Sequence, residues 1–235
     1  FDLWYDETDR FEVTITRPDN TTEGPFAAPA SANDKDDRFL QGMNYYHRGA
    51  DMEFWGATSN RREIMIDFTG ATGEYKVSLK ATTVGGSGSL HATLNPSNFS
   101  YDNKFTSYQV WGHSINDFAS ATKAIVPTDY VVKNNWIDMD GNPREMTNQG
   151  VQGGLWAGSS IGPTQDGRMG VDFAVPGEVL FAAYSPGTYY SSFDWLLVQG
   201  GENKYGIQNA VSAAAPLTMG VIALMLEYRP NLSPS

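Results

Sequence analysis

Ser212 is the residue of this sequence whose setting could support nucleophilic chemistry. It precedes a run free of charged residues from Ala213 to Leu226, rich in the helix formers Ala, Leu and Met. We therefore expect a buried helix from Ser212 to Glu227, with Ser212 as its N-cap. A hydroxyl at a helix start lies among unpaired backbone N–H groups, at the positive end of the helix dipole. That position favours the negative charge that develops when a serine attacks a carbonyl.

An ordinary capping serine is the alternative, and capping serines are far commoner than catalytic ones. Catalysis also needs a base within hydrogen-bond reach and a group that orients the base. The chain has three histidines: His47 and His91 in its β-rich part, and His113 just before a predicted strand. We expect surface or rim positions for all three, and none of them as the base.

The composition excludes several classes of function. The 235 residues carry a formal net charge of -11 and a pI of about 4.6, a surface that repels phosphate backbones, so we expect no nucleic acid partner. Absence of cysteine excludes disulfides, thiolate metal sites and cysteine catalysis. No apolar run reaches the roughly twenty residues that span a bilayer, so we expect no membrane partner. Both ends of the chain look cut from a longer protein.

The sequence predicts a mixed fold in two domains. Residues 1–112 show short alternating strands such as FEVTIT at 11–16, which predict an all-β sandwich of jelly-roll type. The segment from Gly24 to Asp37, rich in Pro, Ala, Asn and Asp, predicts a long surface loop. Residues 113–235 predict an α/β layer that combines short strands, a glycine-rich loop and the helix after Ser212.

Within residues 113–235, three further local predictions follow. A buried strand is expected around 124–132, with Pro127 at a bulge or strand end. The segment WIDMDGN at 136–142 predicts a hairpin turn. The run VDFAVPGEVLFAAY at 171–184 predicts a strand that breaks at Pro176 and Gly177.

Three blocks in residues 115–235 resemble the subtilisin-like serine proteases (subtilases), in the order of that family. The first, SAAAPL at 212–217 with its glycine-containing helix and RPNLSP at 229–234, resembles the active-serine segment Gly-Thr-Ser-x-Ala-x-Pro of the kexin-like variant. The second, SSIGPTQDGR at 159–168 with Pro176-Gly177, resembles the run Ser-Ser-x-Gly-Pro-Thr-x-Asp-Gly-Arg…Ala-Pro-Gly. The third is the segment 117–126, similar to the strand that precedes the second block. Residues 1–112 are more loosely similar to the β-sandwich insertions of some bacterial subtilases.

The resemblance implies a secreted or cell-surface serine endopeptidase that acts through an acyl-enzyme on Ser212. Asn209, Ala210 and Val211 would line the substrate, and the Ser212 N–H would be one oxyanion donor. The family order of Asp, His, Ser implies that base, acid and oxyanion Asn lie upstream, in the N-terminal half of the same peptidase domain. The substrate would be a protein or peptide, and we expect this chain alone to be inactive.

Two alternatives stay open. The family's Gly-Thr before the serine is replaced here by Ala210-Val211, which is also what a catalytically inactive pseudoprotease would show. In the other alternative, the β-sandwich is a binding module for a glycan or protein, and Ser212 is only a cap.

No cofactor is predicted, and calcium is the alternative. The segment from Asp138 resembles the start of a calcium loop, but its glycine comes too early and Gln149 stands at the twelfth position, so a hairpin turn is preferred. A solvated loop is preferred for Asp34, Asp36 and Asp37, and local roles are preferred for Asp166 and Asp172 over triad acids. Several aromatic residues could form a sugar platform, although strand-core positions are commoner: Trp4, Tyr45, Tyr46, Trp55 and Trp111.

Overall fold

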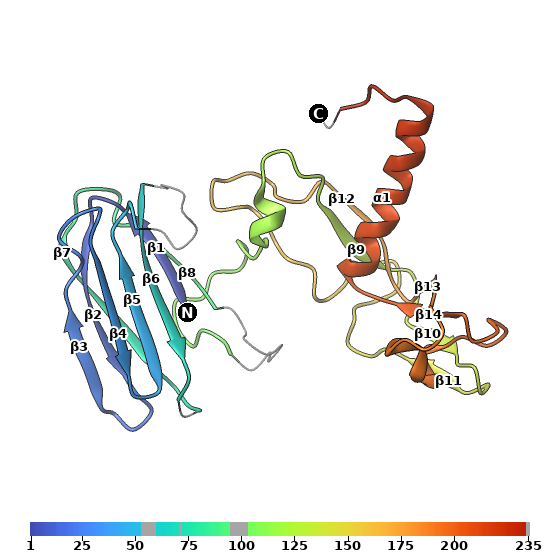
Figure 1. The fold of residues 1–235 in the computed structure, drawn as a ribbon, viewed down its shortest axis with the longest axis horizontal. Coiled ribbons are helices and arrows are strands. Elements are labelled where there is room, and N and C mark those ends of the chain that lie inside the picture. The colour runs from blue at the N-terminus through green and yellow to red at the C-terminus, as the bar shows by residue number, and fades with distance from the viewer. Residues whose placement is uncertain (53–59, 71, 95–102, 234–235) are drawn as a thin grey trace. The chain divides into compact units, whose positions relative to one another are not determined.

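The structure is a computed structural model, and it describes residues 1–52, 60–70, 72–94 and 103–233. The chain divides into two compact units, Phe1–Tyr108 (unit 1) and Gln109–Ser235 (unit 2). Unit 1 therefore ends a few residues before the boundary predicted from the sequence. Figure 1 shows the elements of both units.

Unit 1 consists of antiparallel strands in two sheets. The larger sheet has the order β4-β5-β6-β1-β8 and the smaller has the order β3-β2-β7. The strands are β1 Asp2–Asp6, β2 Arg10–Thr16, β3 Thr22–Phe26, β4 Lys35–Leu40, β5 Met43–Arg48, β6 Arg61–Phe68, β7 Lys76–Thr83 and β8 Leu90–Thr93.

Alternating side chains from both sheets form one hydrophobic core. In β2, every second residue is buried, as expected for a strand with one face in the interior. The core combines residues from β1, β2, β3, β5 and β6: Leu3, Tyr5, Phe11, Val13, Ile15, Phe26, Met43, Tyr45, Ile64 and Ile66. The prediction of a mixed, β-rich fold is confirmed, and jelly-roll connectivity stays a prediction.

The long surface loop predicted for residues 24–37 is wrong at both of its ends. Gly24 and Pro25 lie inside β3, and β4 begins at Lys35. Gly24 has a φ of 102°, and a Cβ there would lie 2.5 Å from the carbonyl oxygen of Val13 on β2. Strand pairing with β2 therefore overrides the turn-like composition, and glycine makes the close approach possible.

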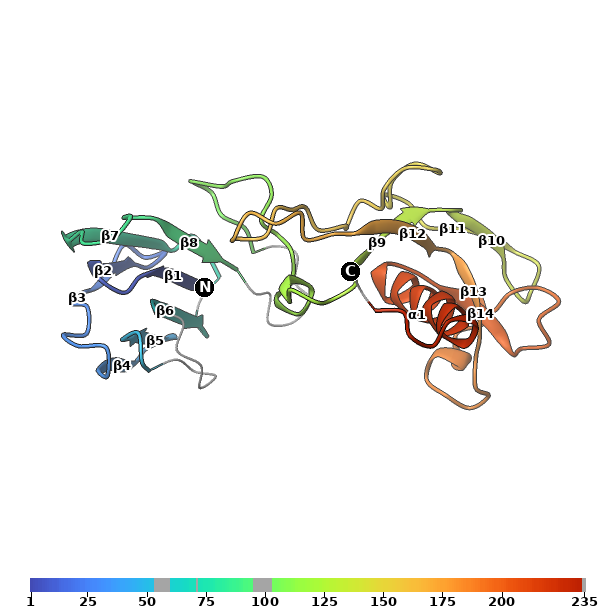
Figure 2. The same cartoon turned by 90° about the horizontal axis from the view of Figure 1, so that it is seen from above.

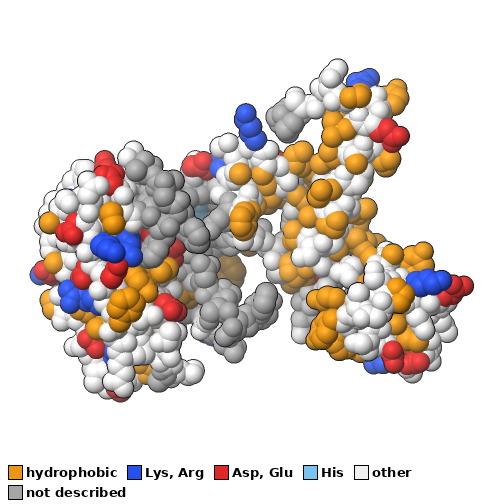
Figure 3. Space-filling view, viewed as in Figure 1, with side chains coloured by type: hydrophobic (Ala, Val, Ile, Leu, Met, Phe, Trp, Pro, Cys, Tyr) orange, Lys and Arg blue, Asp and Glu red, His pale blue; other side chains and the backbone are white. Residues whose placement is uncertain are grey.

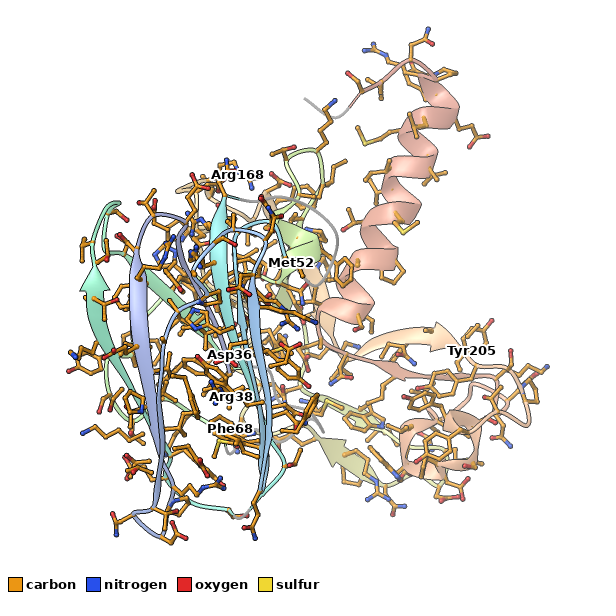
Figure 4. The ribbon with its side chains drawn as sticks, turned by 60° about the vertical axis from the view of Figure 1, so that its left-hand side comes forward. Asp36, Arg38, Met52, Phe68, Arg168 and Tyr205 are labelled. Atoms are coloured by element: carbon orange, nitrogen blue, oxygen red, sulfur yellow. The ribbon has the colours of Figure 1, made fainter. Side chains whose placement is uncertain are left out.

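The aspartates of this segment have protein partners. Asp36 and Arg38 lie on β4, where their side chains form an ion pair of 2.8 Å (Figure 4). Asp37 pairs with Lys35 and Arg48, and Asp34 accepts the backbone N–H of Lys35. Residues 27–34 lie outside the strands, whereas Asp36 and Asp37 lie on β4.

The aromatic residues named as a possible sugar platform, for which strand-core positions were preferred, differ in exposure. Tyr45 is fully buried in the core, whereas Trp111 is 85% exposed and belongs to the other unit. Trp4 is half-buried on β1, and Trp55 lies outside the described residues.

His47 is fully buried in unit 1, so the prediction of a surface or rim position is wrong. It is an inward-facing residue of β5, two places after Tyr45. Its Nε2 lies 2.5 Å from the Tyr5 hydroxyl, and its Nδ1 lies 2.9 Å from the Tyr45 hydroxyl. Burial lowers the pKa of His47 to about 3, and the nearby charges of Arg62 and Arg10 act in the same direction. The ring is therefore neutral and structural at ordinary pH.

This neutral histidine makes unit 1 sensitive to acid. The unfolded chain takes up a proton near the ordinary pKa of 6.5 but the folded chain does so only near 3, so stability is lost as pH falls through that window. We expect the melting temperature to drop by more than about 5 °C between pH 7 and pH 4. His47→Gln, which keeps hydrogen-bonding capacity but cannot titrate, should flatten this dependence in differential scanning calorimetry.

His91→Gln on β8 is the matched control and should keep the acid transition. An unchanged pH dependence in His47→Gln would contradict the assignment.

Unit 2 contains several small sheets and a helix. Its elements are η1 Asp117–Ser120, β9 Pro127–Val131, β10 Asn135–Ile137, β11 Pro143–Glu145, β12 Phe173–Glu178, β13 Leu180–Ala183, η2 Tyr190–Ser192, η3 Asp194–Leu196, β14 Tyr205–Gln208 and α1 Val211–Tyr228. Strands β9 and β12 pair in parallel, whereas β10–β11 and β13–β14 are antiparallel pairs.

The strand predictions for unit 2 are partly correct. Pro127 is the first residue of β9, a position that tolerates its missing N–H, but residues 117–120 form a 3-10 helix and not a strand. β12 continues through Pro176 and Gly177 with an irregular register, and the strand is interrupted at Val179, whose φ is 54°.

The predicted hairpin turn after Trp136 is confirmed by the antiparallel pairing of β10 with β11. The fully buried Asp138 carboxylate accepts the backbone N–H groups of Asp140 and Asn142 and pairs with Arg144 at 2.7 Å. Both oxygens of the Asp138 carboxylate thus bond groups within the hairpin, which is the structure predicted for this segment.

Helix α1 packs on β9 and β12 through its first two turns (Figure 2). Ala213, Ala214 and Thr218 are its buried residues. Most of the other helix residues are exposed, so the prediction of a buried helix is wrong for this chain. Apolar side chains line the visible side of the helix in Figure 3, and the exposed ones are Leu217, Met219, Val221, Leu224, Met225, Leu226 and Tyr228.

The helix is also longer than the sequence pattern predicted. Among the described residues, α1 alone is long and apolar enough to cross a membrane by length and composition, which is weak evidence of a span. At 18 residues the helix stays below the roughly twenty that a bilayer span needs, and the absence of a membrane partner stays a prediction.

Candidate active site

Ser212 is the second residue of α1, and Ala210 occupies the N-cap position that we predicted for Ser212. The Ala210 carbonyl accepts the N–H groups of Ala213 at 2.8 Å and Ala214 at 3.3 Å, so the helix begins two residues earlier than predicted. Ala210 makes no side-chain cap and has φ 64° and ψ -174°. This conformation is essentially restricted to glycine, because a Cβ strains it.

The Ser212 side chain is exposed, in the first turn of α1. Within the described residues, its hydroxyl has no hydrogen-bond partner and its N–H has no backbone acceptor. The first turn also contains no acidic side chain that would offset the positive helix end. Position 212 therefore offers an accessible hydroxyl and an unoccupied N–H at the same residue.

Glu178 anchors the chain at the start of this helix. It is the last residue of β12, it is fully buried, and its Oε1 accepts the Ala210 N–H at 2.9 Å. Its Oε2 is buried without a hydrogen-bond partner in the described structure. Burial raises the pKa of Glu178, and the hydrogen bond from Ala210 opposes this rise. Both backbone groups of Ala210 are therefore bonded: Glu178 accepts its N–H, and its carbonyl accepts N–H groups from the first turn of α1.

Asp129 is a second buried carboxyl group, on the neighbouring strand β9. It is fully buried, and neither of its oxygens has a hydrogen-bond partner among the residues described. Burial raises its pKa to about 7, and the charge of Glu178 adds to this rise. A Cβ at Gly177 would lie 2.1 Å from the Asp129 Cγ, so glycine is needed where β12 passes this side chain.

Sequence reasoning missed both buried acids. The available signal was a single acidic residue within an otherwise uncharged segment in each case: PTDYVV for Asp129 and VPGEVLF for Glu178. A charge on a buried strand requires a partner or a proton, and such groups gather at functional sites.

The other residues predicted for the site lie next to Ser212 in the chain. Asn209, Ala210 and Val211 are half-buried. The Asn209 Nδ2 lies 3.6 Å from the Met146 Sδ. A hollow of about 750 Å³ in unit 2 is lined by Thr128, Trp156, Pro163 and neighbouring residues, and residues 209–212 do not line it.

Among the described residues of unit 2, no hydrogen bond or ion pair joins Asp166 or Asp172 of the glycine-rich block to Ser212. His47 and His91 belong to unit 1, and His113 lies in unit 2 with a φ of 54°. Asp166 accepts a 2.5 Å hydrogen bond from Thr164 and pairs at 2.8 Å with Arg168, which is labelled in Figure 4. Asp172 accepts the Val126 N–H at 2.7 Å. The local role predicted for Asp166 is confirmed, whereas Asp172, just before β12, bonds a residue 46 positions away in the chain.

The described residues contain no group of three or more His, Asp or Glu side chains that could hold a metal ion. The serine at the helix start, its anchoring glutamate and the buried aspartate are therefore the chemical groups to compare with known proteins.

The model of the subtilase family matches residues 46–235, which is most of the chain. The chain belongs to the subtilase family. The resemblance inferred from the three sequence blocks is thereby confirmed. No curated protein matches this subtilase significantly.

Among solved structures, this subtilase is similar to the CspB protease of Clostridium perfringens. The TM-score is 0.56 at 14% sequence identity, a likeness that concerns the fold. The match covers 97% of this chain and 40% of the CspB protease chain. The subtilase chain thus spans less than half of the length of that protein.

The strained Ala210 yields a stability prediction. Replacing it with glycine removes about 1–3 kcal/mol of backbone strain but increases the entropy of the unfolded chain, so we expect Ala210→Gly to stabilise by about 1 kcal/mol. The measurement is the midpoint of urea denaturation at an unchanged slope.

Ala223→Gly, in the exposed middle of α1, is the control and should destabilise by about 1 kcal/mol. Equal losses in both variants would show that Ala210 is not strained.

Proposed function

We propose that this chain is part of a secreted subtilisin-like serine endopeptidase in which Ser212 is the nucleophile. The observation that carries the proposal is the exposed Ser212 hydroxyl, with its own unoccupied N–H, in the first turn of a helix in a subtilase chain. The Oγ attacks the scissile carbonyl carbon and gives its proton to a base. The resulting oxyanion accepts the Ser212 N–H as one of its donors.

The amine product leaves with a proton from the base, and an acyl-enzyme remains on Ser212. Water then attacks the ester, releases the acid product and restores the hydroxyl. Asn209, Ala210 and Val211 line the substrate beside the serine. No cofactor takes part, and the substrate is a protein or peptide.

The base, the acid and the oxyanion Asn come from the N-terminal half of the same peptidase domain, outside this chain. One observation supports this proposal: the chain spans 40% of the CspB protease chain, to which its fold is similar. The exposed apolar side of α1 is the surface that this half covers, since a row of exposed Leu, Met and Val side chains is costly in water. We therefore assign α1 to a protein interior and propose no membrane partner.

Unit 1 is the inserted β-sandwich, of jelly-roll type, and the acidic protein acts at the cell surface or outside the cell without a nucleic acid partner.

The test uses the longer protein that carries this chain. Ser212→Ala should reduce peptide hydrolysis by several orders of magnitude, because the acyl-enzyme cannot form. Ser192→Ala, an exposed serine whose hydroxyl bonds the Tyr189 carbonyl at 2.6 Å, is the matched control and should keep full activity. Hydrolysis that survives Ser212→Ala would overturn the proposal.

The isolated chain should not hydrolyse peptides or react with a fluorophosphonate, since it lacks the base. Turnover with fluorophosphonate labelling of this chain would contradict that part of the proposal.

The second candidate is a pseudoprotease, favoured by one observation. The Ala210-Val211 pair replaces the family's Gly-Thr, and Ala210 is strained in the conformation that glycine adopts freely. A folded longer protein that neither hydrolyses peptides nor reacts with a fluorophosphonate would support this candidate over the endopeptidase.

A further inference from the structure

Two buried carboxyl groups next to the start of α1 have no part in the reaction as described above. Asp129 on β9 and Glu178 on β12 are both fully shielded from water. Burying two acids on adjacent strands costs free energy unless they are paired or protonated. Neither forms an ion pair with the lysines or arginines described in the structure. Because burial of these two acids costs free energy and Glu178 bonds Ala210, two residues before Ser212, we ask what they contribute to the site.

The hydrogen bonds distinguish the two groups. Glu178 accepts the Ala210 N–H, and a bond of this kind stabilises the ionised form of a carboxyl group. Asp129 accepts no hydrogen bond, so its neutral form is favoured. Two buried carboxylates cannot both ionise cheaply, and the single N–H donor assigns the charge to Glu178 and the proton to Asp129.

The hydrogen bond from Ala210 decides where Ser212 lies. Ala210 is held with φ 64°, and its carbonyl starts α1, so the direction in which the chain enters the helix depends on this one residue. Without an acceptor at Glu178, the strained peptide can relax to an ordinary negative φ. That rotation would displace both the hydroxyl and the N–H of Ser212, two residues further on.

We propose that Glu178 is a positioning residue for Ser212, that it acts by accepting the Ala210 N–H, and that Asp129 is its neutral, proton-bearing partner. This inference rests on the proposed function of Ser212 as nucleophile. It assigns no contact between Glu178 and the substrate.

The arrangement has a consequence for pH dependence. Asp129 is the charged residue of β9, Glu178 that of β12, and α1 carries none from Val211 to Leu226. No neighbouring cation on these elements compensates a second negative charge. When pH rises through about 7, Asp129 ionises beside Glu178, and the repulsion loosens the hold on Ala210. Activity should therefore decline on the alkaline side in a way that Asp129→Asn removes.

The first experiment compares Glu178→Gln with Glu178→Leu in the longer protein that carries this chain. Glutamine keeps an oxygen acceptor for the Ala210 N–H, and leucine of similar size does not. We expect kcat to fall about 100-fold in Glu178→Leu and only a few-fold in Glu178→Gln, with KM nearly unchanged in both. Glu202→Gln, an exposed glutamate paired with Lys204, is the control and should retain the parental kcat.

The second experiment measures the pH dependence of kcat in Asp129→Asn and decides the matter if Glu178→Leu does not fold. The alkaline decline should disappear in this variant. Equal kcat values for folded Glu178→Leu and Glu178→Gln would overturn the positioning role, and superimposable pH profiles for Asp129→Asn and the parent would overturn the role of Asp129.

Ser212→Ala in the same assay separates this inference from the proposed function. If Ser212→Ala abolishes hydrolysis while Glu178→Leu matches Glu178→Gln, only the positioning inference fails. If hydrolysis survives Ser212→Ala, the nucleophile assignment fails, and the inference fails with it.

Discussion

The hydrogen bond from the Ala210 N–H to the buried Glu178 carboxylate links the end of a strand to the start of the helix that carries Ser212. Unit 2 depends on this link because its sheets are small and its helix is supported only over the first two turns. A charged acceptor holds a backbone N–H more strongly than a neutral one, which suits a position where the backbone is strained. In the positioning role proposed for Glu178, this constraint sets the position of the serine hydroxyl, which has no hydrogen-bond partner of its own among the described residues.

The two units differ in how much of their apolar surface is buried. Unit 1 buries a core drawn from both of its sheets, including a histidine between two tyrosine hydroxyls. Unit 2 buries a smaller cluster around Trp136, Leu197 and Ile207, and leaves most of its helix in solvent. Of the two units, unit 2 therefore has the smaller hydrophobic core among the described residues.

Sequence reasoning was most successful where local chemistry decides structure. Alternation in β2, the turn after Trp136 and the membership of the subtilase family were all predicted from short patterns. It failed where a distant neighbour overrides local preference. Gly24 and Pro25 resemble a loop but pair with β2, and His47 was expected at the surface although its place in the alternation of β5 directs it inward. The helix start was misplaced by two residues because a glutamate 32 positions away holds Ala210.

By itself, the sequence determined that a serine stands at the start of an apolar helix, in a block pattern shared with the subtilases. Residue order carries that information because helix propensity and motif spacing are local properties. Only the tertiary structure decided that Ser212 lies inside the first turn, that Ala210 is strained, and that Asp129 and Glu178 are buried together behind it. Burial and strand pairing set those features, since the pKa of a carboxyl group and the φ of a helix-capping residue depend on neighbours far away in the chain.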